Sequence, residues 1–132
     1  MASPSTRLYD RDYVLLNAVN FLYSLYSVIF IFLPAYMYRL GIREGTIGVL
    51  MATGALVSVV LKPGLGMVVG RGARRAFLSL GAFLAAASTV PWLFVTVPGA
   101  HLFLIRVAQG ASFSIFSAAS YAYIAALSLI HI

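Results

Sequence analysis

The sequence predicts an all-α membrane protein with four transmembrane helices. Of its 132 residues, 62% are hydrophobic and only 9% are charged, whereas a soluble domain averages about 25% charged residues. Four long apolar runs are separated by short polar or basic segments, and each run is long enough to cross a bilayer, which takes about 20 residues. Most of the surface is therefore predicted to face lipid or other membrane helices.

The predicted helices cover, in chain order, residues 13–38, 45–69, 76–97 and 101–126. Residues 1–12 are polar and form the predicted N-terminal segment. They do not resemble a secretory signal, because Asp10 and Asp12 precede an apolar run that is too long for a signal peptide.

The first helix carries a polar stripe. Asn17, Asn20, Ser24 and Ser27 recur at steps of three or four residues, and Tyr23 and Tyr26 lie beside them. Lipid offers no partner to an amide, so this stripe is predicted to face protein or a water-filled path. Two interpretations stay open: hydrogen bonds between helices, worth under about 1 kcal/mol each, or the wall of a substrate path.

The second helix combines small residues with a charge. Gly54 and Ser58 form a small-xxx-small pair that favours close packing against another helix. Lys62 lies inside the apolar run. Its amine either extends to the headgroups or acts as a gate or coupling charge.

A basic connection links the second and third helices. Residues 66–75 read Gly-Met-Val-Val-Gly-Arg-Gly-Ala-Arg-Arg, so Arg71, Arg74 and Arg75 lie within five residues with no acid among them. The N-terminal segment on the same side adds Arg7 and Arg11. The positive-inside rule therefore places both in the cytoplasm, and predicts a multi-pass protein of the cell (inner) membrane.

The third helix is rich in alanine, and Trp92 near its far end is typical of an interface anchor. The fourth helix contains Arg106, with Gln109 one turn further along and on the same face. A charge at this depth costs a few kcal/mol and usually has a role. Arg106 is either an interfacial anchor or a buried charge in a transport path, and the Phe30 carbonyl, which Pro34 leaves without its helical donor, is a candidate acceptor.

Other classes of function find no support. The chain has no cysteine, and its two histidines show no metal-site spacing. No nucleophile–base pair or phosphate loop is visible, so we expect neither an enzyme nor a cofactor. The formal charge of +6 does not indicate nucleic-acid binding, because the basic residues lie at the ends of apolar runs.

Two motifs resemble a known family. The stretch Gly66-x-x-x-Gly70-Arg71-x-Ala73-Arg74-Arg75 resembles the G-x-x-x-D-R-x-G-R-R/K loop of the major facilitator superfamily, and Arg106-x-x-Gln109-Gly110 resembles its R-x-x-Q-G motif. Both occur at the expected helices. Gly70 replaces the family's aspartate and Ala73 replaces a glycine, which puts the charge network of that loop in doubt.

The resemblance implies a secondary active transporter that moves small organic solutes by alternating access, and it suggests proton-coupled efflux. Asn17, Asn20, Tyr23, Tyr26, Arg106 and Gln109 would then serve the substrate path or coupling, and Gly66, Gly70, Arg71, Arg74 and Arg75 the cytoplasmic gate. Family members have about twelve helices in two halves. We therefore expect this chain to be the N-terminal part of such a fold, with the remaining helices, the lipid bilayer, a small-molecule substrate and protons as partners.

Two alternatives remain. One is a complete four-helix transporter that works as an oligomer, as small multidrug transporters do. Those proteins rely on a membrane-embedded glutamate in the first helix, and residues 13–38 contain none. The other is a membrane scaffold that transports nothing.

Overall fold

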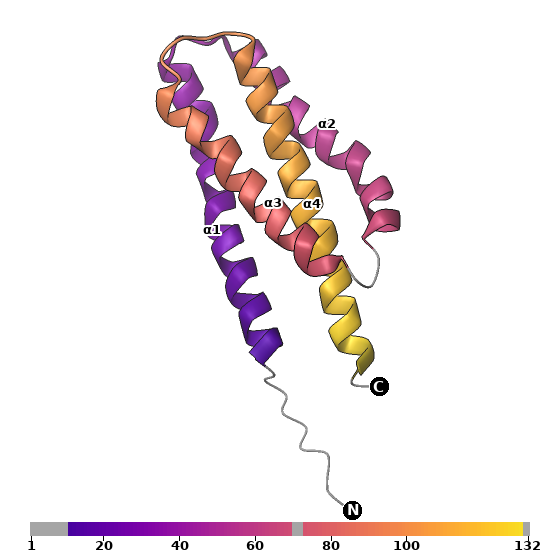
Figure 1. The fold of residues 1–132 in the computed structure, drawn as a ribbon. Coiled ribbons are helices and arrows are strands. Elements are labelled where there is room, and N and C mark those ends of the chain that lie inside the picture. The colour runs from indigo at the N-terminus through magenta and orange to yellow at the C-terminus, as the bar shows by residue number, and fades with distance from the viewer. Residues whose placement is uncertain (1–10, 70–72, 131–132) are drawn as a thin grey trace, which may run out of the picture.

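Four long helices form the fold in the computed structural model, which describes residues 11–69 and 73–130, without the side chains of residues 12 and 127–130. The elements are α1 (Arg11–Arg39), α2 (Glu44–Val68), α3 (Arg74–Thr89), the short 3₁₀ helix η1 (Val90–Phe94) and α4 (His101–Ile130). They run alternately up and down, so that the connections 40–43 and 95–100 lie together at one end (Figure 1). This arrangement confirms the predicted all-α membrane fold.

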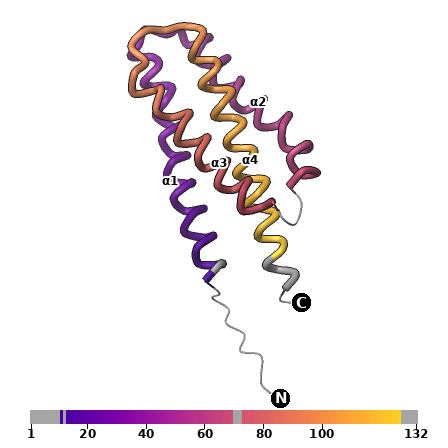
Figure 2. Tube along the Cα trace, in the orientation of Figure 1, coloured from indigo at the N-terminus to yellow at the C-terminus, as the bar shows by residue number. Residues whose placement is uncertain are grey.

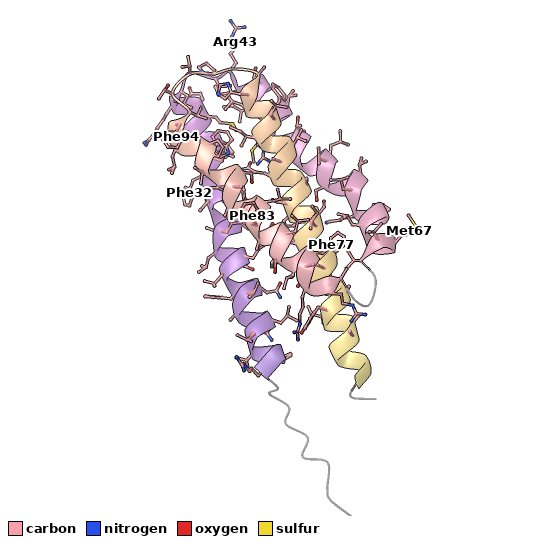
Figure 3. The ribbon with its side chains drawn as sticks, in the orientation of Figure 1. Phe32, Arg43, Met67, Phe77, Phe83 and Phe94 are labelled. Carbon is pink, nitrogen blue, oxygen red and sulfur yellow. The ribbon has the colours of Figure 1, made fainter. Side chains whose placement is uncertain are left out.

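Each of the four helices is long and apolar enough to cross a membrane, with α3 and η1 together making one span. Large apolar side chains point outward from the bundle, among them Phe32, Met67, Phe83 and Phe94 (Figure 3). Phe32 is 68% exposed and Met67 83% exposed. Such an apolar exterior is suited to lipid or to further membrane helices. The chain is a multi-pass membrane protein.

The central helix is α4, which packs closely against α2 and α3, while α1 makes fewer contacts with the others (Figure 2). Small residues allow this closeness. A Cβ atom on Gly81 of α3 would lie 2.7 Å from the backbone nitrogen of Phe116. Between α2 and α4, the Ser114 hydroxyl donates to the Ser58 carbonyl at 2.9 Å, so Ser58 of the predicted small-xxx-small pair does lie at a helix interface.

Helix α1 ends at a Schellman motif. Gly41 has φ +79°, in the left-handed region that favours glycine. The Ile42 amide donates to Met37 at 3.2 Å, and the Gly41 amide to Tyr38 at 3.0 Å. Met37 and Ile42 are both buried. The cap therefore joins the main apolar cluster, which lies at this end of the bundle and comprises Leu33, Met37, Ile42, Ile47, Leu50, Trp92, Val95, Leu102 and Ile105.

The third span differs from the sequence prediction. Its α-helical part stops at Thr89, and η1 follows instead of an α-helix to residue 97. Pro91 explains the change, because it lacks the amide hydrogen that would continue the α-helical hydrogen bonds; Val90 itself keeps α-region angles of φ −52° and ψ −42°. The prediction of Trp92 as an interface anchor is wrong. Trp92 is 8% exposed and lies in the apolar cluster. Its ring meets that of Tyr36 edge-on, with 6.4 Å between the ring centroids.

Candidate functional site

Arg106 is buried between α2 and α4. Its side chain is 7% exposed. Nε donates to the Leu50 carbonyl at 3.1 Å and Nη2 to the Met51 carbonyl at 3.3 Å. Both acceptors are neutral oxygens of the α2 backbone, so the guanidinium is held in place while its charge is not neutralised.

The acceptor predicted from the sequence was wrong. Arg106 donates its backbone-directed hydrogen bonds to the carbonyl oxygens of Leu50 and Met51, and not to that of Phe30. The Phe30 ring faces the guanidinium, with Cζ of Arg106 5.5 Å from the ring centroid. Phe30 therefore contributes a cation–π contact. The prediction placed Phe30 correctly beside Arg106, but the contact is made by its ring and not by its carbonyl oxygen.

Gln109 completes the arrangement. Nη1 of Arg106 donates to Oε1 of Gln109 at 3.0 Å. Since arginine has donors only, the amide oxygen must face it, and the Gln109 NH₂ group must point elsewhere. That Nε2 is buried and has no hydrogen-bond partner among the described residues. The predicted pair of Arg106 and Gln109 is thus brought together, and the NH₂ group of Gln109 is left without a described partner.

Gly54 makes room for the arginine. A Cβ atom there would lie 2.8 Å from Nη2 and 3.1 Å from Cζ of Arg106. The close approach of Gly110 to Gly54 brings the two helices together at the same level. The site thus depends on two glycines that face each other across the α2–α4 interface.

A cleft of about 390 Å³ opens beside this group. We call it the Arg106 cleft. It is lined by Phe30 of α1, by Met51, Gly54, Ala55, Ser58 and Val59 of α2, and by Arg106, Gln109, Gly110 and Phe113 of α4. A second cation lies nearby: Nζ of Lys62, an exposed residue that does not line the cleft, lies 5.2 Å from the centroid of the Phe113 ring. Of the two interpretations of Lys62, neither is tested by this contact.

The aromatic residues of α1 contact one another in a row that ends at Phe30, which lines the cleft. The Tyr23 ring stacks on Phe116 of α4 at 3.7 Å. The ring centroid of Tyr26 lies 5.3 Å from that of Tyr23 and 5.1 Å from that of Phe30, which it meets edge-on. The Tyr26 hydroxyl is buried without a partner among the described residues. Tyr23 and Tyr26 are therefore adjacent to the Arg106 cleft through Phe30.

The polar stripe of α1 is mostly satisfied within its own helix. Asn17, Asn20, Ser24 and Ser27 each donate to the carbonyl four residues earlier. Asn20 also crosses to α4, where its Oδ1 accepts from the Ser120 hydroxyl at 2.9 Å. Asn17 is exposed and lies apart from the Arg106 cleft.

Three of the predicted gate residues are described, and Gly66, Arg74 and Arg75 lie at the opposite end of the bundle from the apolar cluster. Gly70 and Arg71 fall outside the described residues. Nη2 of Arg75 donates to the Tyr123 hydroxyl at 3.4 Å, which links α3 to α4. Nε of Arg74 is buried with no partner in the described part of the chain, and Gly66 is exposed near the end of α2.

One of three comparisons with known proteins gave a match. The sequence model of the Major Facilitator Superfamily matches residues 15–129. The chain belongs to the major facilitator superfamily. Searches of curated proteins and of solved structures each gave no match. Members of this superfamily are transporters, so the chain is of the major facilitator type, and its motif pair falls inside the matched region.

Sequence reasoning missed two features of the site. The acceptors of Arg106 are backbone carbonyls, which every residue carries, so no residue type could indicate them. Lys62 and Phe113 are 51 positions apart in the chain, and only the packing of α2 on α4 brings them together. The clearance at Gly54 did have a signal in the small-xxx-small pair. Within the described ranges, no group of three or more His, Asp or Glu residues could hold a metal ion.

Proposed function

We propose that this chain forms the wall of an alternating-access carrier for small organic solutes, with efflux driven by protons. The observation that carries the proposal is the buried Arg106, which is held by neutral groups beside an open cleft. A membrane-buried charge is costly, and in transporters such charges mark solute or ion paths. Asn20 and Tyr23 contact α4, Tyr26 contacts Phe30 and Gln109 bonds to Arg106. In this proposal these four residues and Asn17 serve the path or its coupling.

The proposal assigns the cytoplasmic gate to Gly66, Gly70, Arg71, Arg74 and Arg75. The Arg75–Tyr123 bond supports this role, because it joins α3 and α4 at that end of the bundle. The N-terminus and the basic loop lie in the cytoplasm in this proposal, and the protein lies in the cell (inner) membrane. Further helices of the same carrier cover the exposed apolar faces.

Transport by purified protein tests the proposal. The protein is expressed from its complete reading frame and reconstituted into liposomes with an imposed pH gradient. Benzenesulfonate, glucose and ethidium serve as anionic, neutral and cationic probes. We expect the gradient to drive accumulation of at least one probe, and a protonophore to abolish it.

The matched variants are Arg106→Gln and Arg43→Gln. Arg43 is exposed in the connection between α1 and α2 (Figure 3), so its loss should leave transport unchanged, whereas Arg106→Gln should abolish it. Movement of all three probes at the rate of protein-free liposomes would contradict the proposal.

A further inference from the structure

The Arg106 cleft carries positive charge that no described residue neutralises. None of its lining residues is acidic. The three hydrogen bonds that Arg106 donates go to two carbonyl oxygens and one amide oxygen, all neutral. In a low-dielectric environment an uncompensated cation attracts an anion strongly.

Hydrogen-bond donors are also left over at this point. A guanidinium has five N–H groups, and three of those on Arg106 are used in the described structure. The remaining two lie on the terminal nitrogens. The Nε2 group of Gln109, a residue only 4% exposed, adds a buried donor without a described partner. A buried donor that lacks a hydrogen-bond acceptor costs free energy. This cluster is therefore suited to a ligand that accepts several hydrogen bonds.

A second cation strengthens the same preference. Nζ of Lys62 lies over the ring of Phe113; Phe113 lines the cleft, whereas Lys62 is exposed and lies outside its lining. Phe113 follows Arg106 by seven residues in α4, which corresponds to about 10 Å along the helix axis. The cleft therefore has one cation in its lining, a second beside Phe113, and apolar walls formed by Phe30, Met51 and Val59.

We propose that the Arg106 cleft selects small organic anions, with the carboxylate or sulfonate group bound by Arg106 and Gln109. The apolar body of the solute packs against Phe30 and Met51, and Lys62 adds longer-range attraction from its place beside Phe113. This inference rests on the proposed transport function and names its substrate class.

Binding of two isosteric probes tests the inference. Benzenesulfonate is anionic and benzenesulfonamide is neutral at pH 7, with nearly the same shape. The detergent-solubilised protein from its complete reading frame is titrated with each, and binding is followed by calorimetry. We expect benzenesulfonate to bind at least about tenfold more tightly, which is the order expected for charge-assisted hydrogen bonds.

Two variants locate the preference. Gln109→Glu keeps the size of the side chain and places a carboxylate beside Arg106, so it should remove the preference for benzenesulfonate over benzenesulfonamide. Lys62→Gln should weaken benzenesulfonate binding several-fold. Arg43→Gln removes an equal charge outside the cleft and should change neither.

Equal affinity for the two probes, no binding of benzenesulfonate, or undiminished benzenesulfonate binding by Gln109→Glu would each overturn the inference. Failure here is distinguishable from failure of the transport proposal. A protein that moves ethidium or glucose under a pH gradient but does not prefer benzenesulfonate remains a carrier with another substrate class.

Discussion

Gly110 of α4 lies against the carbonyl oxygen of Gly54 in α2, so closely that a Cβ atom at Gly110 would collide with it. The same Cβ would lie 3.1 Å from Cβ of Val57. Neither neighbour can move easily, because one is backbone and the other is a β-branched side chain. This contact sets the separation of α2 and α4, and with it the position of the α2 carbonyls that hold Arg106.

Gly110→Ala is therefore expected to destabilise the bundle. Overpacking of this kind costs about 1–3 kcal/mol. Gly48→Ala is the matched control, because Gly48 also lies in a helix and has nothing within 4 Å of an added Cβ. Helix propensity predicts that the control is neutral or stabilising by up to about 1 kcal/mol. Unfolding in dodecyl sulfate, followed by circular dichroism, measures both, and equal stabilities of the two variants would contradict the packing argument.

The Asn20–Ser120 hydrogen bond is expected to contribute measurably to the attachment of α1. A double-mutant cycle of Asn20→Leu and Ser120→Ala should give a coupling energy of about 0.6 kcal/mol, the average for hydrogen bonds between membrane helices. The cycle of Asn17→Leu with Ser120→Ala should give none, since Asn17 bonds to Tyr13 of its own helix. A larger coupling for Asn17 than for Asn20 would show that α1 is rotated relative to this structure.

The orientation in the membrane follows from the distribution of arginines. A reporter fused near Gly99 is expected to lie outside the cytoplasm, because the 95–100 connection is at the opposite end from Arg74 and Arg75 (Figure 1). Alkaline phosphatase, which is active only outside the cytoplasm, should be active at Gly99, and green fluorescent protein there should be dark. The converse pattern would reverse the proposed topology.

The sequence predicted the fold class well, because span length and hydropathy depend on each segment alone. The predicted first helix ends at residue 38 and α1 ends at Arg39, because a helix end also depends on the residues near it. The sequence prediction failed at Trp92, where burial depends on how η1 packs against α1. It also failed at the acceptor of Arg106: Pro34 pointed to Phe30, but the spacing set by Gly54 and Gly110 brought the carbonyls of α2 closer.

In the proposed carrier, the Arg106 cleft opens in turn to each side of the membrane. A single cysteine at Val59 tests it most directly, because Val59 lines the cleft and is 66% exposed, and this chain has no native cysteine. Any cysteine elsewhere in the reading frame is replaced by serine. Phe83→Cys is the control, since Phe83 is 69% exposed on α3 and does not line the cleft. A membrane-impermeant maleimide should label Val59→Cys from both sides of the membrane and Phe83→Cys from neither; labelling of Val59→Cys from one side only, or from neither, would contradict the account.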